Sequence, residues 1–128
     1  MEPLPSWMRR ALFATAIMNV LAALGFLPGA GAVRALAGLP QDGQPLYLLT
    51  VAMFVGLFGL GYFVAGMTGR PDRTFLGVAA AGKIGFFTLL AGFWLAGSVP
   101  LQAPLLGSAD LVFGTLFLIW LLGGRAPA

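Results

Sequence analysis

The sequence predicts an all-α integral membrane protein, an antiparallel four-helix bundle that forms one domain over residues 1–128. Hydrophobic residues make up 59% of the chain and charged residues only 9%, which leaves too few charged side chains to give a soluble domain of this size its polar surface. The apolar residues also fall into four long stretches, each close to the roughly 20 residues that a helix needs to cross a bilayer. We therefore expect most apolar side chains to face lipid.

Segments rich in Gly, Pro and polar residues separate the four apolar stretches. The predicted transmembrane helices cover residues 8–27, 46–67, 75–97 and 103–122. The first connection, residues 28–45, is the longest. It contains the sequence AVRALAGL, whose composition is compatible with a short helix lying in the membrane interface.

Tight turns join the second helix to the third and the third to the fourth. In TGRPDRT (68–74), Pro71 is expected to end one helix, and either Asp72 or Thr74 to cap the next. The sequence SVPLQAP (98–104) contains two prolines, which interrupt a helix in the same way. Four crossings connected in this manner place both termini on the same side of the membrane.

The basic residues are distributed unevenly between the two sides of the predicted bundle. Arg34 lies alone on the side of the first connection, whereas five arginines fall on the opposite side: Arg9, Arg10, Arg70, Arg73 and Arg125. Positive charge favours the cytoplasmic side, so we predict cytoplasmic N- and C-termini in the cytoplasmic (inner) membrane. Aromatic residues near the helix ends agree with this orientation, with one pair at each interface: Trp7 and Trp120 inside, Tyr47 and Trp94 outside.

The N-terminal sequence MRRALF, followed by an apolar run and then AGA (30–32), has an alternative interpretation as a signal peptide, including one of the twin-arginine type. The apolar core of a signal peptide spans about 7 to 15 residues. The stretch over residues 8–27 is longer. A first transmembrane helix anchored by Arg9 and Arg10 therefore fits the sequence better.

Small residues recur at a spacing of four in all four predicted helices, which is typical of close helix contacts in lipid. In the first helix they form one stripe, predicted to point inward: Ala11, Thr15, Asn19 and Ala23. The Gly and Ala series of the other helices favour a compact bundle, and they are also compatible with an interface between two copies of the chain.

A single lysine, Lys83, interrupts the apolar run AAAGKIGFF (79–87). At 1.5 Å per residue it lies about 12 Å into the bilayer, and Asp110 of the fourth helix lies about 20 Å above the same inner surface. A lysine side chain can bridge most of this difference in height. An unpaired charge near the bilayer centre costs about 2.5 to 3.5 kcal/mol, so we predict that the two residues pair.

Other polar residues at similar predicted depths complete a buried polar cluster. Its predicted members are Asn19, Tyr62, Lys83, Thr88, Asp110 and Thr115. Two interpretations remain open: the cluster fixes helix register and rotation, or it binds protons, ions or the polar head of a ligand. In a third arrangement Lys83 extends toward the cytoplasm and Asp110 is protonated, which removes the cluster.

The chain has no His and no Cys, which excludes disulfides, thiol redox chemistry, His-ligated haem and the usual zinc sites. No nucleophile–base pair, metal-ligand set or phosphate-binding loop is recognisable. We therefore expect no metal and no cofactor. The net charge of +3 resides in arginines that a bilayer accounts for, so no nucleic-acid partner is expected.

The sequence GLGYFVAGMTGRPDRTFLGVAAAGKIGFF (59–87), followed by ADLVFGTLFLIWLL (109–122), resembles small four-helix bacterial membrane proteins, loosely similar to the DoxX-like group. The resemblance covers most of residues 46–122. It rests on a Gly-Tyr, an Arg-Pro-Asp-Arg turn, a Gly-Lys, and an Asp followed by Phe-rich sequence. It implies a fold and a membrane location but no common activity. DoxX itself is associated with redox partners, and this role is not carried over because the chain has no redox motif.

Three functions are compatible with these features. The favoured one is a non-enzymatic binding or accessory protein that holds a lipophilic ligand or a membrane-protein partner around the cluster, with the lipid bilayer as its surroundings. The second is a transporter or channel, which would require a homodimer to enclose a pathway. The third, ranked last, is a membrane enzyme that uses Asp110 or Lys83 in acid–base chemistry on a lipid.

Overall fold

A computed structural model describes residues 4–123 of the chain, and this part is helical apart from its turns. The four long helices are α1 (Ser6–Gly25), α3 (Pro45–Thr68), α4 (Arg73–Leu95) and α5 (Gln102–Gly123). The first connection contains the short 3₁₀ turn η1 (Pro28–Ala30) and helix α2 (Gly31–Leu36). All four long helices are long and apolar enough to cross a membrane. The four predicted helical segments are confirmed, with small shifts at their ends.

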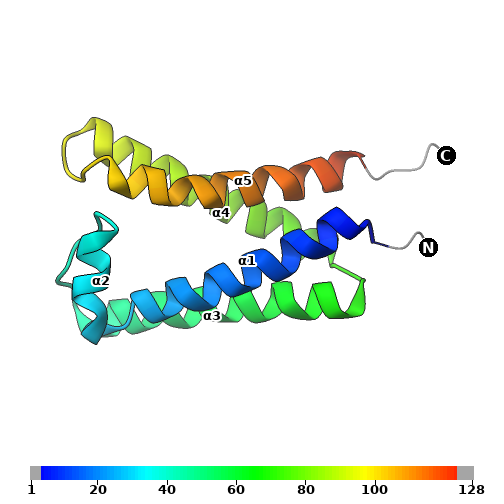
Figure 1. The fold of residues 1–128 in the computed structure, drawn as a ribbon, viewed down its shortest axis with the longest axis horizontal. Coiled ribbons are helices and arrows are strands. Elements are labelled where there is room, and N and C mark those ends of the chain that lie inside the picture. The colour runs from blue at the N-terminus through cyan, green and yellow to red at the C-terminus, as the bar shows by residue number, and fades with distance from the viewer. Residues whose placement is uncertain (1–3, 124–128) are drawn as a thin grey trace.

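The long helices are arranged in two pairs, in which α1 packs along α3 and α4 packs along α5. Figure 1 shows that the pairs lie close together where α1 begins and α5 ends, and separate toward the opposite end. The helices therefore form a V with a closed end and an open end. Helix α2 lies across the open end, between the two pairs (Figure 1).

Local sequence explains where α3 and α4 begin and where α3 ends. Helix α3 starts with proline, whose missing N–H is not needed at that position, and it ends at Gly69, which adopts the left-handed conformation with φ of 66°. Asp72 caps α4, because its Oδ1 accepts a hydrogen bond from the backbone N–H of Phe75 at 3.0 Å. Asp72 is thus the cap among the two predicted candidates.

The apolar core fills the closed end of the V. The Tyr62 ring of α3 lies 5.6 Å from the Phe75 ring of α4 and 5.5 Å from the Phe117 ring of α5, measured between centroids. Met8 and Leu12 of α1 are completely buried in the same core. Contacts between aromatic rings at these distances add to the stabilisation from burial. All four long helices therefore meet at the closed end.

Small residues allow α1 and α3 to approach closely. The predicted inward stripe of α1 is confirmed at Ala11, Thr15 and Asn19, which are all buried. Opposite this stripe, a Cβ added at Gly59 of α3 would lie 3.0 Å from the Cβ of Asn19. A side chain at this position would push the two helices apart.

Glycines of α5 allow close contact between α4 and α5, whereas the glycines of α4 do not take part in this contact. A Cβ added at Gly114 would lie 2.8 Å from Ile84 Cγ1 and 3.2 Å from the carbonyl oxygen of Ala80, both on α4. A Cβ added at Gly77 or Gly85 of α4 would meet no heavy atom within 4 Å in the described part of the chain. The α4 series is therefore not used for contacts within this fold.

Valine at position 114 tests the close approach of α4 and α5. We expect Gly114→Val to lower the free energy of unfolding in detergent by about 1 to 3 kcal/mol, because the added side chain overpacks the contact with α4. Gly85→Val is the matched control, since its side chain enters open space. Thermal unfolding followed by circular dichroism measures both. Equal destabilisation of the two variants would contradict the packing described.

Candidate functional site

Lys83 lies midway along α4, with its side chain only 5% exposed. Its Nζ donates hydrogen bonds to Asp110 Oδ1 of α5 at 2.9 Å and to Asn19 Oδ1 of α1 at 3.2 Å. The ion pair expected from the depths of Lys83 and Asp110 is therefore present, and the ammonium group links three helices.

The close contact between α4 and α5 positions this ion pair. A Cβ added at Gly114 would lie 3.3 Å from the Cβ of Lys83, so the α5 backbone passes directly beside the base of the lysine side chain. Asp110 precedes Gly114 by four residues, which places both on the same face of α5. Lys83 therefore reaches the carboxylate by extending along that face.

Two aromatic rings complete the surroundings of the ammonium group. Nζ lies 5.2 Å from the centroid of the Tyr62 ring on α3 and 5.8 Å from that of Phe113 on α5. Both distances fall within the range in which the face of a ring attracts a cation. With Tyr62, all four long helices contribute to the site.

Asn19 has both ends of its side-chain amide engaged. Its Nδ2 donates to the backbone carbonyl of Val55 on α3 at 3.0 Å, while its Oδ1 accepts from Lys83. The absence of a side chain at Gly59 permits this approach of α1 to α3. The orientation of the amide is therefore determined on both sides, and Asn19 directs its oxygen toward the ammonium group.

A cavity of about 710 Å³ lies between the two helix pairs, on the open side of the cluster. Its volume is within the range of about 300 to 1,000 Å³ that is typical of small-molecule sites. Its polar lining residues include Asn19, Lys83 and Asp110, and most of the remaining lining residues are apolar. On each of α1 and α5 the cluster residue is among the lining residues nearest the closed end. On α4, Val78 and Ala79 line the cavity about one turn nearer the closed end than Lys83. The cluster therefore forms most of the floor of the cavity.

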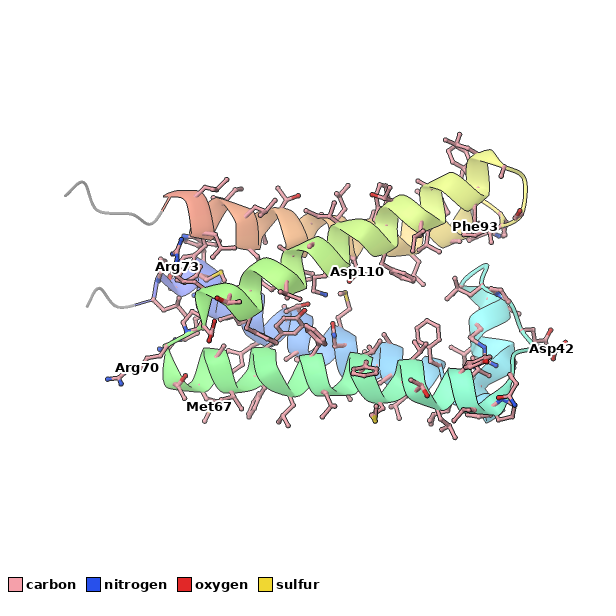
Figure 2. The ribbon with its side chains drawn as sticks, turned by 180° about the vertical axis from the view of Figure 1, so that it is seen from behind. Asp42, Met67, Arg70, Arg73, Phe93 and Asp110 are labelled. Atoms are coloured by element: carbon pink, nitrogen blue, oxygen red, sulfur yellow. The ribbon has the colours of Figure 1, made fainter. Side chains whose placement is uncertain are left out.

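The cavity is open sideways, between the helix pairs. Several of its lining side chains are also exposed at the surface, including Phe54 of α3, Phe86 of α4, Leu21 of α1 and Leu106 of α5. Figure 2 shows the α4/α5 pair separated from α3 on the α2 side of the molecule, with Asp110 midway along the helices. A lipophilic molecule beside the protein could enter without crossing the closed core.

Arg34 of α2 holds together the segment that covers the open end, residues 26–44, which is called the covering segment below. Its side chain is buried, and its guanidinium donates to four backbone carbonyls: Gly25 at 3.0 Å, Leu27 at 2.6 Å, Pro40 at 3.2 Å and Gln41 at 2.8 Å. Gly25 is the last residue of α1 and Leu27 follows it closely, at a helix end where carbonyls lack helical partners and a cation is favourable. Arg34 thus joins both ends of this segment.

The covering segment also reaches the turn between α4 and α5. Gly38 adopts a left-handed conformation, with φ of 77°, and a Cβ added there would lie 2.9 Å from Pro100 Cγ and 3.0 Å from the backbone nitrogen of Ala103. Only glycine fits this position without strain. The contact places the segment across the gap between the two helix pairs.

Sequence reasoning missed the structural role of Arg34, which was counted only as the single positive charge of the first connection. The signal was nevertheless present, because a lone arginine in a Gly- and Pro-rich loop faces many carbonyls that have no partner in regular structure.

Thr88 and Thr115 do not belong to the cluster, which corrects the prediction. Both are exposed, and their hydroxyls donate to the carbonyls of Ile84 and Leu111 one turn earlier in their own helices. Each threonine follows a cluster residue by five positions, which rotates it by about 140° around the helix axis. Thr88 and Thr115 therefore lie at a depth similar to that of the cluster but on another face of their helices.

Residues 4–123 contain no group of three or more His, Cys, Asp or Glu side chains that could hold a metal ion. Arg125, one of the five arginines expected on the cytoplasmic side, lies outside the described residues. The chemistry of the site therefore rests on one ammonium group, one carboxylate, one amide and the surrounding rings.

Comparison of the chain with protein-family models, with curated proteins and with solved structures finds no match. The resemblance to DoxX-like proteins therefore stays a prediction. Function has to be argued from the cavity and the polar cluster.

Removing one member of the ion pair tests its contribution. We expect Lys83→Met to lower the free energy of unfolding by about 3 kcal/mol, near the lower limit for breaking a buried pair, because Asp110 is partly exposed. The double variant Lys83→Met/Asp110→Asn should recover more than half of this loss, since it leaves no buried charge. Chemical unfolding in detergent gives the values, with Thr115→Val as a neutral control. A double variant as unstable as the sum of the two single variants would contradict a direct pair.

Replacing Arg34 by lysine tests the attachment of the covering segment. A lysine cannot donate to four carbonyls at once, so Arg34→Lys should increase hydrogen exchange in residues 26–44 at least tenfold while leaving α4 and α5 protected. Exchange followed by mass spectrometry resolves these regions, and Arg70→Lys in an exposed turn is the matched control. Unchanged protection of residues 26–44 would show that other contacts hold the segment.

Proposed function

We propose that this chain is a multi-pass membrane protein, an antiparallel four-helix bundle of a bacterial inner membrane, that binds an amphipathic molecule in the cavity between its helix pairs. In this proposal the apolar part of the ligand lies between the pairs, and its polar head reaches the floor formed by Lys83, Asp110 and Asn19. The protein acts as a binding or accessory protein and carries out no reaction. The observation that carries the proposal is an apolar cavity that ends on a buried polar cluster.

Membrane insertion is supported by the outer surface of the long helices. Large apolar side chains are exposed on all four of them, for example Val20, Leu60, Leu89 and Ile119. A soluble monomer rarely exposes a continuous apolar surface of this kind. Lipid around the helices would cover this apolar surface and keep it out of water.

The distribution of arginines supports cytoplasmic termini. In Figure 2 Arg70 and Arg73 lie at the closed end of the V, at the opposite end from Asp42. Arg9 lies near this end too, because its guanidinium approaches Gly69. Arg34, on the side of the open end, is engaged by backbone carbonyls. By the positive-inside rule the closed end faces the cytoplasm and the cavity opens toward the outer leaflet.

The closed core argues against transport through a single copy. Below the cluster, Met8, Leu12, Leu76 and Phe117 are completely buried and meet at the centre of the four helices. On α4 the cavity lining reaches Val78 and Ala79, about one turn past Lys83, and no residue of this core other than Ala79 and Tyr62 lines it. This arrangement favours retention of a ligand over its passage across the membrane.

Filling the cavity tests the proposal. Gly82 lines the cavity, and a Cβ added there meets nothing within 4 Å. We expect Gly82→Phe to reduce copurifying lipophilic molecules at least tenfold, because its ring would occupy the space beside Lys83. Mass spectrometry of organic extracts, normalised to protein, measures the retained molecules.

The matched control is Gly85→Phe, one turn away on the same helix, where the added ring also enters open space but the position does not line the cavity. This variant should retain ligand as the wild type does. Equal retention by both variants, or no specifically retained molecule in the wild type, would contradict the proposal.

A further inference from the structure

The hydrogen-bonding groups on the cavity floor are unequally satisfied. Two donors of Lys83 are used by Asp110 and Asn19, and both ends of the Asn19 amide are engaged. Asp110 accepts through Oδ1 alone, and its Oδ2 accepts no hydrogen bond from any residue between 4 and 123. The side chain of Asp110 is also 21% exposed, compared with 5% for Lys83. Lys83 keeps a third N–H, but its side chain is the less accessible of the two. A ligand in the cavity therefore meets the unused carboxylate oxygen of Asp110 first.

The charges of the floor are already balanced. Lys83 and Asp110 form a pair with no net charge, 2.9 Å apart. A carboxylate head would compete with Asp110 for the ammonium group, and an ammonium head would compete with Lys83 for the carboxylate. Either would leave one uncompensated charge in apolar surroundings, which is costly.

A second cation, Arg34, lines the cavity but does not change the charge balance between Lys83 and Asp110. Arg34 lines the opposite end, and its guanidinium already donates to four backbone carbonyls. Recruiting it to an anionic ligand would break bonds that hold the covering segment to the end of α1. An anionic head therefore has no ready partner at either end.

We propose that the cavity selects amphipathic molecules whose head is uncharged and donates a hydrogen bond, of which a hydroxyl on an apolar body is the simplest. The hydroxyl donates to Asp110 Oδ2 while Lys83 keeps Oδ1 and the Asn19 amide. Hydrogen bonds to an ionised acceptor are about twice as strong as those between neutral groups. This inference names the ligand class of the proposed binding site and rests on that proposed function.

A series of probes with one chain and four heads tests the inference. The probes are 1-dodecanol, its methyl ether, dodecanoate and dodecylammonium, and saturable binding is measured by equilibrium dialysis with the protein in phosphatidylcholine nanodiscs, corrected for empty nanodiscs. The alcohol should bind about tenfold or more tightly than the ether, which cannot donate, since a hydrogen bond to a charged group contributes that much. The alcohol should also bind more tightly than either charged probe.

Asp110→Asn assigns the selectivity to the carboxylate. The variant replaces one carboxylate oxygen by an NH₂ group, so the preference for alcohol over ether should fall to less than about threefold. Gly82→Phe should remove saturable binding of all four probes. The wild-type series remains decisive on its own if Asp110→Asn does not fold.

The outcomes separate the inference from the proposed function. Absence of saturable binding by every probe would overturn both. Tightest binding of dodecanoate or dodecylammonium would overturn the inference and leave a ligand-binding cavity. An alcohol preference that persists in a folded Asp110→Asn protein would also overturn the inference, because another group would then recognise the hydroxyl.

Discussion

The ion pair between Lys83 and Asp110 is the constraint on which the arrangement of the four helices depends. Two charged groups among apolar helices stabilise each other, because the surrounding apolar side chains offer them no alternative partner. Their 2.9 Å contact requires α4 and α5 to pack closely, which Gly114 permits. Asn19 and Tyr62 then tie α1 and α3 to the same ammonium group. Together with the apolar core, this one ammonium group thereby determines how the two helix pairs face each other.

The cavity follows from where this constraint acts. The pairs are held together by the apolar core at the closed end and by the polar cluster midway along the helices, and they separate beyond the cluster (Figure 1). Arg34 and Gly38 bridge the open end without bringing the helices into contact. The space between the pairs is therefore bounded by a polar floor, apolar walls and a covering segment, a combination typical of sites for amphipathic molecules.

The sequence was sufficient to predict those features that depend only on the position of a residue along its helix axis. Hydropathy located four helices, and rise per residue brought Lys83 and Asp110 to compatible depths. Rotation about the axis was left out for Thr88 and Thr115, so these side chains were placed on the wrong faces. The cavity depends on how the helix pairs diverge. The hydrogen bonds of Arg34 depend on which backbone carbonyls lack partners in regular structure. Neither can be read from periodicity.

The central claim is that the helix pairs diverge in a membrane and hold a ligand above the polar cluster. An experimental structure in lipid nanodiscs tests this most directly. The protein is first extracted in mild detergent, so that a bound ligand is retained, and is then transferred to the nanodiscs. We expect elongated density between the pairs, with one end within hydrogen-bonding distance of Asp110. Helix pairs packed together along their full length, with Phe54 and Phe86 in mutual contact where the cavity now lies, would contradict it.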